Sequence, residues 1–188
     1  MVHAVRISAV LLCTAGLAYA DLDLTPRLQT YELEGVQMRQ LVFNDGEQQV
    51  TYSPPRNWEY SGGGNRFVLR PKTETAAEAE ITTTKTQSPA SFNQASVKRL
   101  TDEVLSSVPE NATNVELVSQ QVNPLLIDRK ETLLVIIRYN YYSQSYQRSV
   151  MFLNRKNEQI RFQLTSYRDS FEKLQKSFES SHYSWQNL

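Results

Sequence analysis

The chain has 188 residues and no net charge, because 20 lysines and arginines balance 20 aspartates and glutamates. A balanced chain lacks the strong positive field that gathers nucleic acid or anionic membranes, so we expect neither partner. The single cysteine, Cys13, and one of the two histidines, His3, lie among the first 20 residues. Without them the chain keeps only His182, which excludes a thiolate nucleophile, a disulfide and a zinc site of cysteine and histidine.

Residues 1–20 have the pattern of a secretory signal peptide. Arg6 supplies the positive charge, Ile7–Leu17 is a short apolar stretch, and Ala18-Tyr19-Ala20 is a cleavage sequence before Asp21. The apolar stretch is about half as long as a membrane-spanning helix, so no stable span is expected. Cleavage after Ala20 leaves 168 of the 188 residues, and we expect this part to be secreted or periplasmic.

The chain after the leader begins with a polar segment and then predicts a series of short strands. Residues 21–35, with Pro26 and little periodicity, are expected to form an N-terminal arm or linker. Asn44-Asp45-Gly46 predicts a tight hairpin turn, and the glycine-rich run 61–65 predicts a second hairpin tip. The expected strands are 36–43, 49–52, 58–60, 66–69 and 79–84.

Two later segments predict amphipathic helices. Apolar residues on one helical face predict a helix between Ser91 and Pro109, with Ser91 and Gln94 as a capping box. A second apolar stripe predicts a helix from Tyr167 to Phe178, capped by Ser166 and Asp169. Further strands are expected at 114–118, 133–137, 149–153 and 160–165, and the aromatic tail 182–185 is expected to fold back onto the body.

Strands outnumber helices, and short turns join the later strands, so we expect neighbouring strands to pair antiparallel. The run Leu133–Ile137 is apolar at every position, which is typical of a central strand covered on both faces. We therefore predict one α+β domain at residues 36–188, with an antiparallel β-sheet sandwiched with helices in an α/β/α arrangement.

The order of elements resembles the PsbP-like superfamily, which includes photosystem II extrinsic subunits, Ran-binding Mog proteins and small exported bacterial proteins. The resemblance spans about residues 36–180. It depends on the strand end Val50-Thr51-Tyr52-Ser53-Pro54-Pro55-Arg56-Asn57-Trp58, the central helix and the closing helix with Phe171-Glu172-Lys173-Leu174-Gln175-Lys176-Ser177-Phe178. It implies a protein without enzymatic activity that binds or stabilises other proteins. Metal-binding and partner-binding residues of that family have no recognisable match here.

Three sequence features invite a chemical interpretation, and each also has a structural one. The run Ser61–Gly64 lacks the lysine and the following helix of a phosphate-binding loop, so we favour a hairpin tip. Glu78 and Glu80 share one side of a strand and suggest calcium or acid–base chemistry, but nearby Lys72 and Glu74 suggest an exposed loop edge, so we favour a solvated face. His182 lies too close to the C-terminus for a convincing Ser-His-acid triad.

A tyrosine-rich turn is the one unusual composition. It contains Arg138, Tyr139, Tyr141, Tyr142, Tyr146 and Arg148. Tyrosine and arginine are enriched in binding hot spots, so these six residues are the candidate partner-binding site. Cross-strand aromatic pairs that stabilise the hairpin are the alternative, and we favour it.

We therefore expect an exported domain without catalytic activity, cofactor or metal, which binds or stabilises another exported protein or complex. A carrier of a small apolar or aromatic ligand, held between sheet and helix, is the alternative function. A hydrolase that uses carboxylates or serine is a third. A pocket of about 300 Å³ or more with apolar walls would favour the carrier. Two titratable groups that converge in a cleft would favour the hydrolase.

Overall fold

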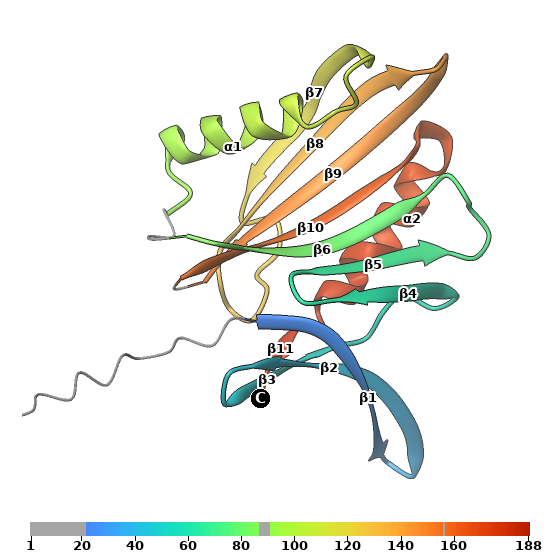
Figure 1. Cartoon of the computed structure of the whole chain (residues 1–188), viewed down its shortest axis with the longest axis vertical. Helices are drawn as coiled ribbons and strands as arrows, with labels where there is room; N and C mark the ends of the chain where they lie inside the picture. The colour runs from blue at the N-terminus through green and yellow to red at the C-terminus, as the bar shows by residue number, and fades with distance from the viewer. Residues whose placement is uncertain (1–21, 87–90, 156) are drawn as a thin grey trace, which may run out of the picture.

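The computed structural model describes residues 22–86, 91–155 and 157–188, so the predicted leader lies outside the described residues. The chain forms two antiparallel sheets and two helices, α1 (Gln94–Ser106) and α2 (Arg168–His182) (Figure 1). The smaller sheet has the order β1 (Leu22–Leu33), β2 (Val36–Asp45), β3 (Gln48–Tyr52) and β11 (Gln186–Asn187). The larger sheet has the order β4 (Trp58–Gly63), β5 (Arg66–Pro71), β6 (Glu78–Lys85), β10 (Glu158–Tyr167), β9 (Gln144–Asn154), β8 (Thr132–Tyr141) and β7 (Thr113–Val122).

Each strand range expected from the sequence lies inside an observed strand, and the paired strands run antiparallel. The strand expected at 114–118 is longer, since β7 spans Thr113–Val122. In the part of the chain that the structure describes, no helix is long and apolar enough to cross a membrane.

The two helices pack on opposite faces of the larger sheet, because its central strands send side chains into two apolar cores. Leu133 and Val135 of β8 pack in one core with Val104 of α1. Leu134, the residue between them, belongs to the other core, together with Phe171 of α2. The uninterrupted apolar run predicted a strand covered on both faces, and β8 is such a strand.

The smaller sheet lies on the same side of the larger sheet as α2 and shares its core. Phe43 of β2 meets Phe67 of β5 edge to face, with 5.3 Å between ring centroids. The predicted α+β class with antiparallel strands is therefore observed, but helices alone do not sandwich the sheet. A second sheet of four strands occupies part of the face for which only helices were expected.

Residues 22–33 correct the expectation of an arm or linker, because they form β1 and pair with β2. Leu22 and Leu24 are buried in the core that joins the two sheets. The Leu24 N–H donates to the Gly64 carbonyl at 2.7 Å. A Cβ atom on Gly63 would lie 2.8 Å from Thr25 Oγ1, so glycine lets β1 approach this hairpin tip. The glycine-rich run is therefore structural.

Both helix starts differ from the predicted caps. Asn93 caps α1, since its side-chain oxygen accepts from the Ser96 N–H at 3.0 Å, whereas the Ser91 carbonyl accepts from the Ser96 hydroxyl. Tyr167 occupies the cap position of α2 and makes no side-chain capping bond. The Ser166 hydroxyl, which was expected to cap α2, instead donates to the Tyr167 carbonyl. The helices predicted from the apolar stripes are observed, because burial, rather than capping, determines which helix face packs against the core.

The C-terminal tail folds back, as predicted, and joins the two sheets. Trp185 is buried and meets Phe162 of β10 edge to face at 5.1 Å. Its ring also lies 5.8 Å from Phe43 and 5.8 Å from Tyr52 of the smaller sheet. Aromatic pairs of this kind contribute about 0.5–1.5 kcal/mol each beyond burial.

A buried ion pair links the two sheets at a second point. Asp45, at the β2–β3 turn, pairs with Arg155, in the β9–β10 turn. Arg155 also pairs with Glu158 at 2.8 Å. All three side chains are largely buried. Removal of one member would leave a charge without its partner in the interior, so this network fixes how the two turns meet.

His182, at the end of α2, lies between the rings of Phe162 and Phe178, each 4.6 Å away. It is fully buried, and neither ring nitrogen has a hydrogen-bond partner within the described residues. Burial lowers its pKa to about 3, so the imidazole is neutral in the folded protein at ordinary pH.

We predict that His182 makes the protein sensitive to acid. The pKa in the unfolded chain is about 6.5, so the unfolded state binds a proton below that pH and the folded state does not until about pH 3. The free energy of unfolding should then fall by up to about 1.4 kcal/mol per pH unit between these values. In His182→Phe this contribution disappears.

The free energy of unfolding is measured by urea titration at pH values from 8 to 4, in steps of about 0.5 pH unit. The difference in unfolding free energy between His182→Phe and the wild type should stay constant above about pH 7 and favour the variant increasingly below about pH 6. Parallel curves over the whole range would show that His182 gains a proton without cost.

Candidate functional site

The distal half of the β1–β2 hairpin extends away from the core (Figure 1). We call residues 27–33 of β1 with residues 36–40 of β2 the ribbon. The ends of β1 and β2 near the core are buried, at Leu22, Leu24 and Leu41–Phe43. Every residue of the ribbon is exposed except Gln40, which is half-buried. The outer half of this two-stranded element is therefore exposed to solvent in the part of the chain that the structure describes.

The ribbon has one apolar face. Tyr31 pairs with Met38, and Leu33 pairs with Val36. Paired residues of antiparallel strands lie on the same face, as do residues two apart, so these four side chains form one patch. Their exposed fractions are 36%, 40%, 57% and 58%. The opposite face carries Thr30, Glu32, Gln37 and Arg39, with Leu28 as its one large apolar residue.

The sequence contained a signal for the ribbon that the expectation of a linker missed. Glu34-Gly35 separates two short alternating runs, Tyr31 and Leu33 before it and Val36 and Met38 after it. Glu34 and Gly35 both have positive φ, at 49° and 79°. This is the type of two-residue turn that favours glycine and joins twisted strands. An acidic residue followed by glycine between alternating apolar residues predicts a hairpin.

The tyrosine-rich candidate site lies at the β8–β9 turn, and its residues do not share one face. Tyr139 is buried and stacks on Tyr146 at 5.6 Å, and Tyr146 lies 5.0 Å from Tyr167. Burial and the neighbouring Tyr167 raise the pKa of Tyr146 to about 12. Tyr141 is half-buried against the same core as α1. These contacts agree with the structural interpretation of the cluster.

The two arginines of the candidate site are also engaged within the chain. Arg148 donates to the carbonyl and hydroxyl of Ser107, at 2.8 and 2.9 Å, to Thr165 at 2.9 Å and to Tyr139 at 3.4 Å. Arg138 pairs with Glu116 of β7. Because Arg138 alternates with the buried Tyr139, it lies on the other face of the sheet.

Tyr142 is the residue of this cluster that faces solvent, with 78% of its surface exposed. Tyr142 and Ser143 form the turn with φ of 46° and 61°, a conformation that such residues rarely adopt. The turn thus presents one tyrosine ring, 4.4 Å from Tyr141, at the end of the larger sheet. Its role in binding stays a prediction.

Glu78 and Glu80 lie on β6, inside the larger sheet, and their partly exposed side chains agree with the solvated face that we favoured. Glu80 pairs with Arg66 at 2.8 Å and accepts from Gln163 at 3.1 Å. Glu78 pairs with Arg66 at 3.2 Å and with Arg70. Both carboxylates already have arginine partners, so their negative charges are balanced without a metal ion.

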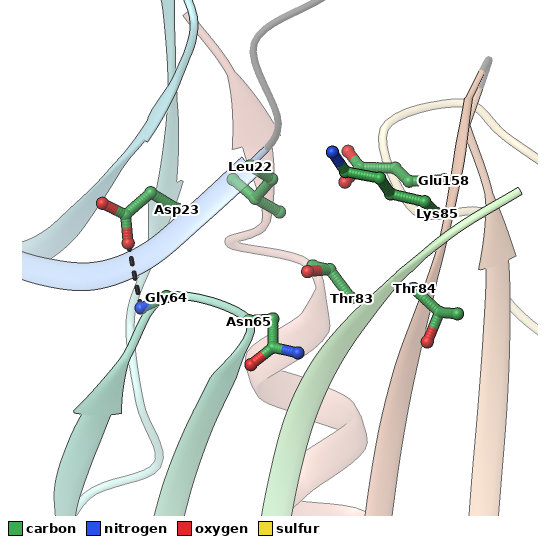
Figure 2. Close-up of a pocket in the computed structure, with 8 residues that line it drawn as sticks. All are labelled: Leu22, Asp23, Gly64, Asn65, Thr83, Thr84, Lys85 and Glu158. Carbon is green, nitrogen blue, oxygen red and sulfur yellow. Dashed lines mark hydrogen bonds between the residues drawn. The ribbon is translucent and has the colours of Figure 1, made fainter.

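A hollow of about 510 Å³ lies where β1, the β4–β5 tip, β6 and β10 meet (Figure 2). Leu22 supplies its apolar part, and Asn65, Thr83, Lys85 and Glu158 supply polar groups. In Figure 2 the Asp23 carboxylate points to Gly64, whose N–H donates to it at 3.0 Å. The hollow is large enough for a small ligand, but its walls differ from the apolar pocket that a carrier requires.

Comparison with known proteins gives similarity of structure without similarity of sequence. No family model and no curated protein matches the chain. PA94 from Pseudomonas aeruginosa, a protein of unknown function described as a candidate regulator, is 12% identical with a TM-score of 0.47. That match covers 83% of this chain and 94% of PA94.

The solution structure of cyanobacterial PsbP from Synechocystis sp. PCC 6803 matches with a TM-score of 0.53 at 15% identity. The match covers 95% of this chain and 99% of the cyanobacterial protein, so it includes both sheets and both helices. At this identity the likeness concerns the fold and leaves function open. The protein has a PsbP-like fold.

Proposed function

We propose that this protein is an exported, non-catalytic domain that binds another exported protein, and that the apolar face of the ribbon is the contact. The observation that carries the proposal is the patch of Tyr31, Leu33, Val36 and Met38 on the exposed outer half of the β1–β2 hairpin. Full burial of a large apolar side chain is worth about 1.5–3 kcal/mol. A partner that covers this face would recover much of that energy.

The chemistry of the other candidate features supports a binding role rather than catalysis. The carboxylates Glu78 and Glu80 are neutralised by Arg66 and Arg70 on an open strand face. The buried His182 lies against the rings of two phenylalanines, and among the described residues neither of its ring nitrogens has a hydrogen-bond partner. Neither group is placed for proton transfer to a substrate.

Export is part of the same proposal. β1 begins at Leu22, two residues after the predicted cleavage at Ala20, so removal of residues 1–20 leaves every described strand intact. We predict that the protein isolated from its native host begins at Asp21, as measured by intact mass and N-terminal sequencing. A chain that retains Met1 in the host would contradict export through this leader.

We predict that the ribbon, and not the tyrosine-rich turn, contacts the partner. A photo-crosslinking residue is placed in living cells at Tyr31, at Tyr142 or, as a control, at Tyr183, all exposed positions. Position 31 should yield a defined protein adduct, while position 183 should not. An adduct at position 142 alone would move the contact to the β8–β9 turn, and no adduct at either would contradict a protein-binding role.

Substitution provides the matched control. Tyr31→Ser with Met38→Ser should lower recovery of the partner about tenfold or more, because two anchors of the patch are lost. Leu117→Ser with Val118→Ser removes comparably exposed side chains from β7 and should leave recovery unchanged. Both variants should unfold within about 1 kcal/mol of the wild type, since exposed residues contribute little to stability.

A further inference from the structure

A shallow groove lies between the loop after β3 and the outer side of α2. Its volume is about 500 Å³, and its walls carry Ser53 and Arg56 on one side and Lys173, Lys176 and Ser180 on the other. Lys173 and Lys176 are three residues apart and therefore neighbours on the helix surface. Three positive charges and several hydroxyl groups thus face one groove.

These three cations differ from most other cations of the protein because no acidic side chain pairs with them. Arg66, Arg138 and Arg161, for comparison, each have a carboxylate partner. Across residues 22–86, 91–155 and 157–188, Arg56, Lys173 and Lys176 form no ion pair. A locally unneutralised groove on a chain of zero net charge attracts anionic groups.

Contacts on both sides hold the groove in shape. The Tyr52 hydroxyl and the Ser181 hydroxyl lie 2.8 Å apart, and the Ser53 N–H donates to the Ser184 hydroxyl at 2.8 Å. Trp58 stacks on Phe178 of α2, with ring centroids 6.0 Å apart and planes 9° apart. The loop therefore cannot move away from α2 without breaking buried contacts, and its cation is held opposite the two lysines.

Among the described residues that line the groove there is no aspartate or glutamate. Glu172 and Glu179 lie on the same helix, but Glu179 accepts a hydrogen bond from Gln175. Asp169 and Glu172 lie four residues before Lys173 and Lys176, and within the described residues no ion pair joins either carboxylate to its lysine. The Ser177 hydroxyl also lines the groove and can donate to a carboxylate oxygen, whereas the Ser180 hydroxyl donates to the Lys176 carbonyl at 2.7 Å.

We infer that this groove is a binding site for an acidic, extended peptide segment of a partner protein. An open groove covers one side of its ligand, which suits an extended chain better than a small molecule that must be largely enclosed. Carboxylates two residues apart in an extended peptide lie about 7 Å from each other, close enough for both to meet the lysine pair and Arg56. The site is separate from the ribbon, so it stands whether or not the ribbon binds.

The test uses a fluorescent peptide of alternating aspartate and glutamate, with the corresponding asparagine and glutamine peptide as the neutral control. Binding is measured by anisotropy at about 50 and 300 mM salt. The acidic peptide should bind and should weaken several-fold at the higher salt, because exposed charges are screened. The neutral peptide should not bind.

Matched variants locate the site. Lys173→Gln with Lys176→Gln should weaken binding about tenfold, since two exposed charge pairs together are worth about 1.4 kcal/mol. Arg129→Gln with Arg168→Gln removes the same charge from exposed arginines elsewhere and should change affinity less than about twofold. Arg56→Gln alone should give an intermediate loss. Equal losses in the lysine and control variants would overturn the site.

Further arms distinguish other anions. Inorganic phosphate and phosphatidylglycerol vesicles are tested in the same way. If either binds through Lys173 and Lys176 while the acidic peptide does not bind, the groove recognises phosphate groups and the peptide site is overturned. Sedimentation measures whether the protein associates with itself. Salt-sensitive self-association that is lost in Glu32→Gln with Glu34→Gln would show that the groove binds the acidic ribbon of a second copy of this chain instead of a partner protein. A failure of peptide binding would not affect the crosslink at Tyr31. The groove and the ribbon are therefore tested independently of each other.

Discussion

The packing of aromatic rings around Trp185, between the two sheets, is the contact on which the rest of the fold depends. Trp185 touches Phe162 of the larger sheet and Phe43 and Tyr52 of the smaller one. Without it, the smaller sheet would retain the buried ends of β1–β3 but lose the part of the core that orients it. The C-terminal strand β11 pairs with β3 and holds the tryptophan in place. The last few residues of the chain therefore position elements from its beginning.

Local patterns predicted the strands and helices well, because their evidence lies in neighbouring residues. The stripe in α2 and the apolar run in β8 each identify a buried surface without knowledge of what covers it. What covers it could not be predicted. Part of one face is covered by a second sheet, and that arrangement depends on Trp185 meeting Phe43, residues separated by most of the chain. A periodic pattern carries no information about such long-range partners.

The candidate site illustrates the same limit. The composition of the tyrosine-rich turn is unusual. Composition alone, however, does not distinguish side chains that stack on one another from side chains that are free to contact another protein. The hydrogen bonds of Arg148 to Ser107 and Thr165 show that this arginine ties β9 to the end of α1. The ribbon was missed for the opposite reason. Its polar flanks and Pro26 resemble a linker, although Glu34-Gly35 and the alternation around it predict a hairpin.

The free edges of both sheets favour binding through side chains over binding by strand addition. Pro26 removes an N–H from β1, and the register of β1 shifts between Asp23 and Arg27. The register of β7, the edge strand of the larger sheet, shifts at two places. Proline and bulges of this kind hinder strand pairing at these positions, whereas residues 27–33 of β1 keep a regular register. At these positions a partner is favoured to meet side chains, and the apolar face of the ribbon and the cations that line the groove beside α2 are surfaces on which such contacts break no native pairing.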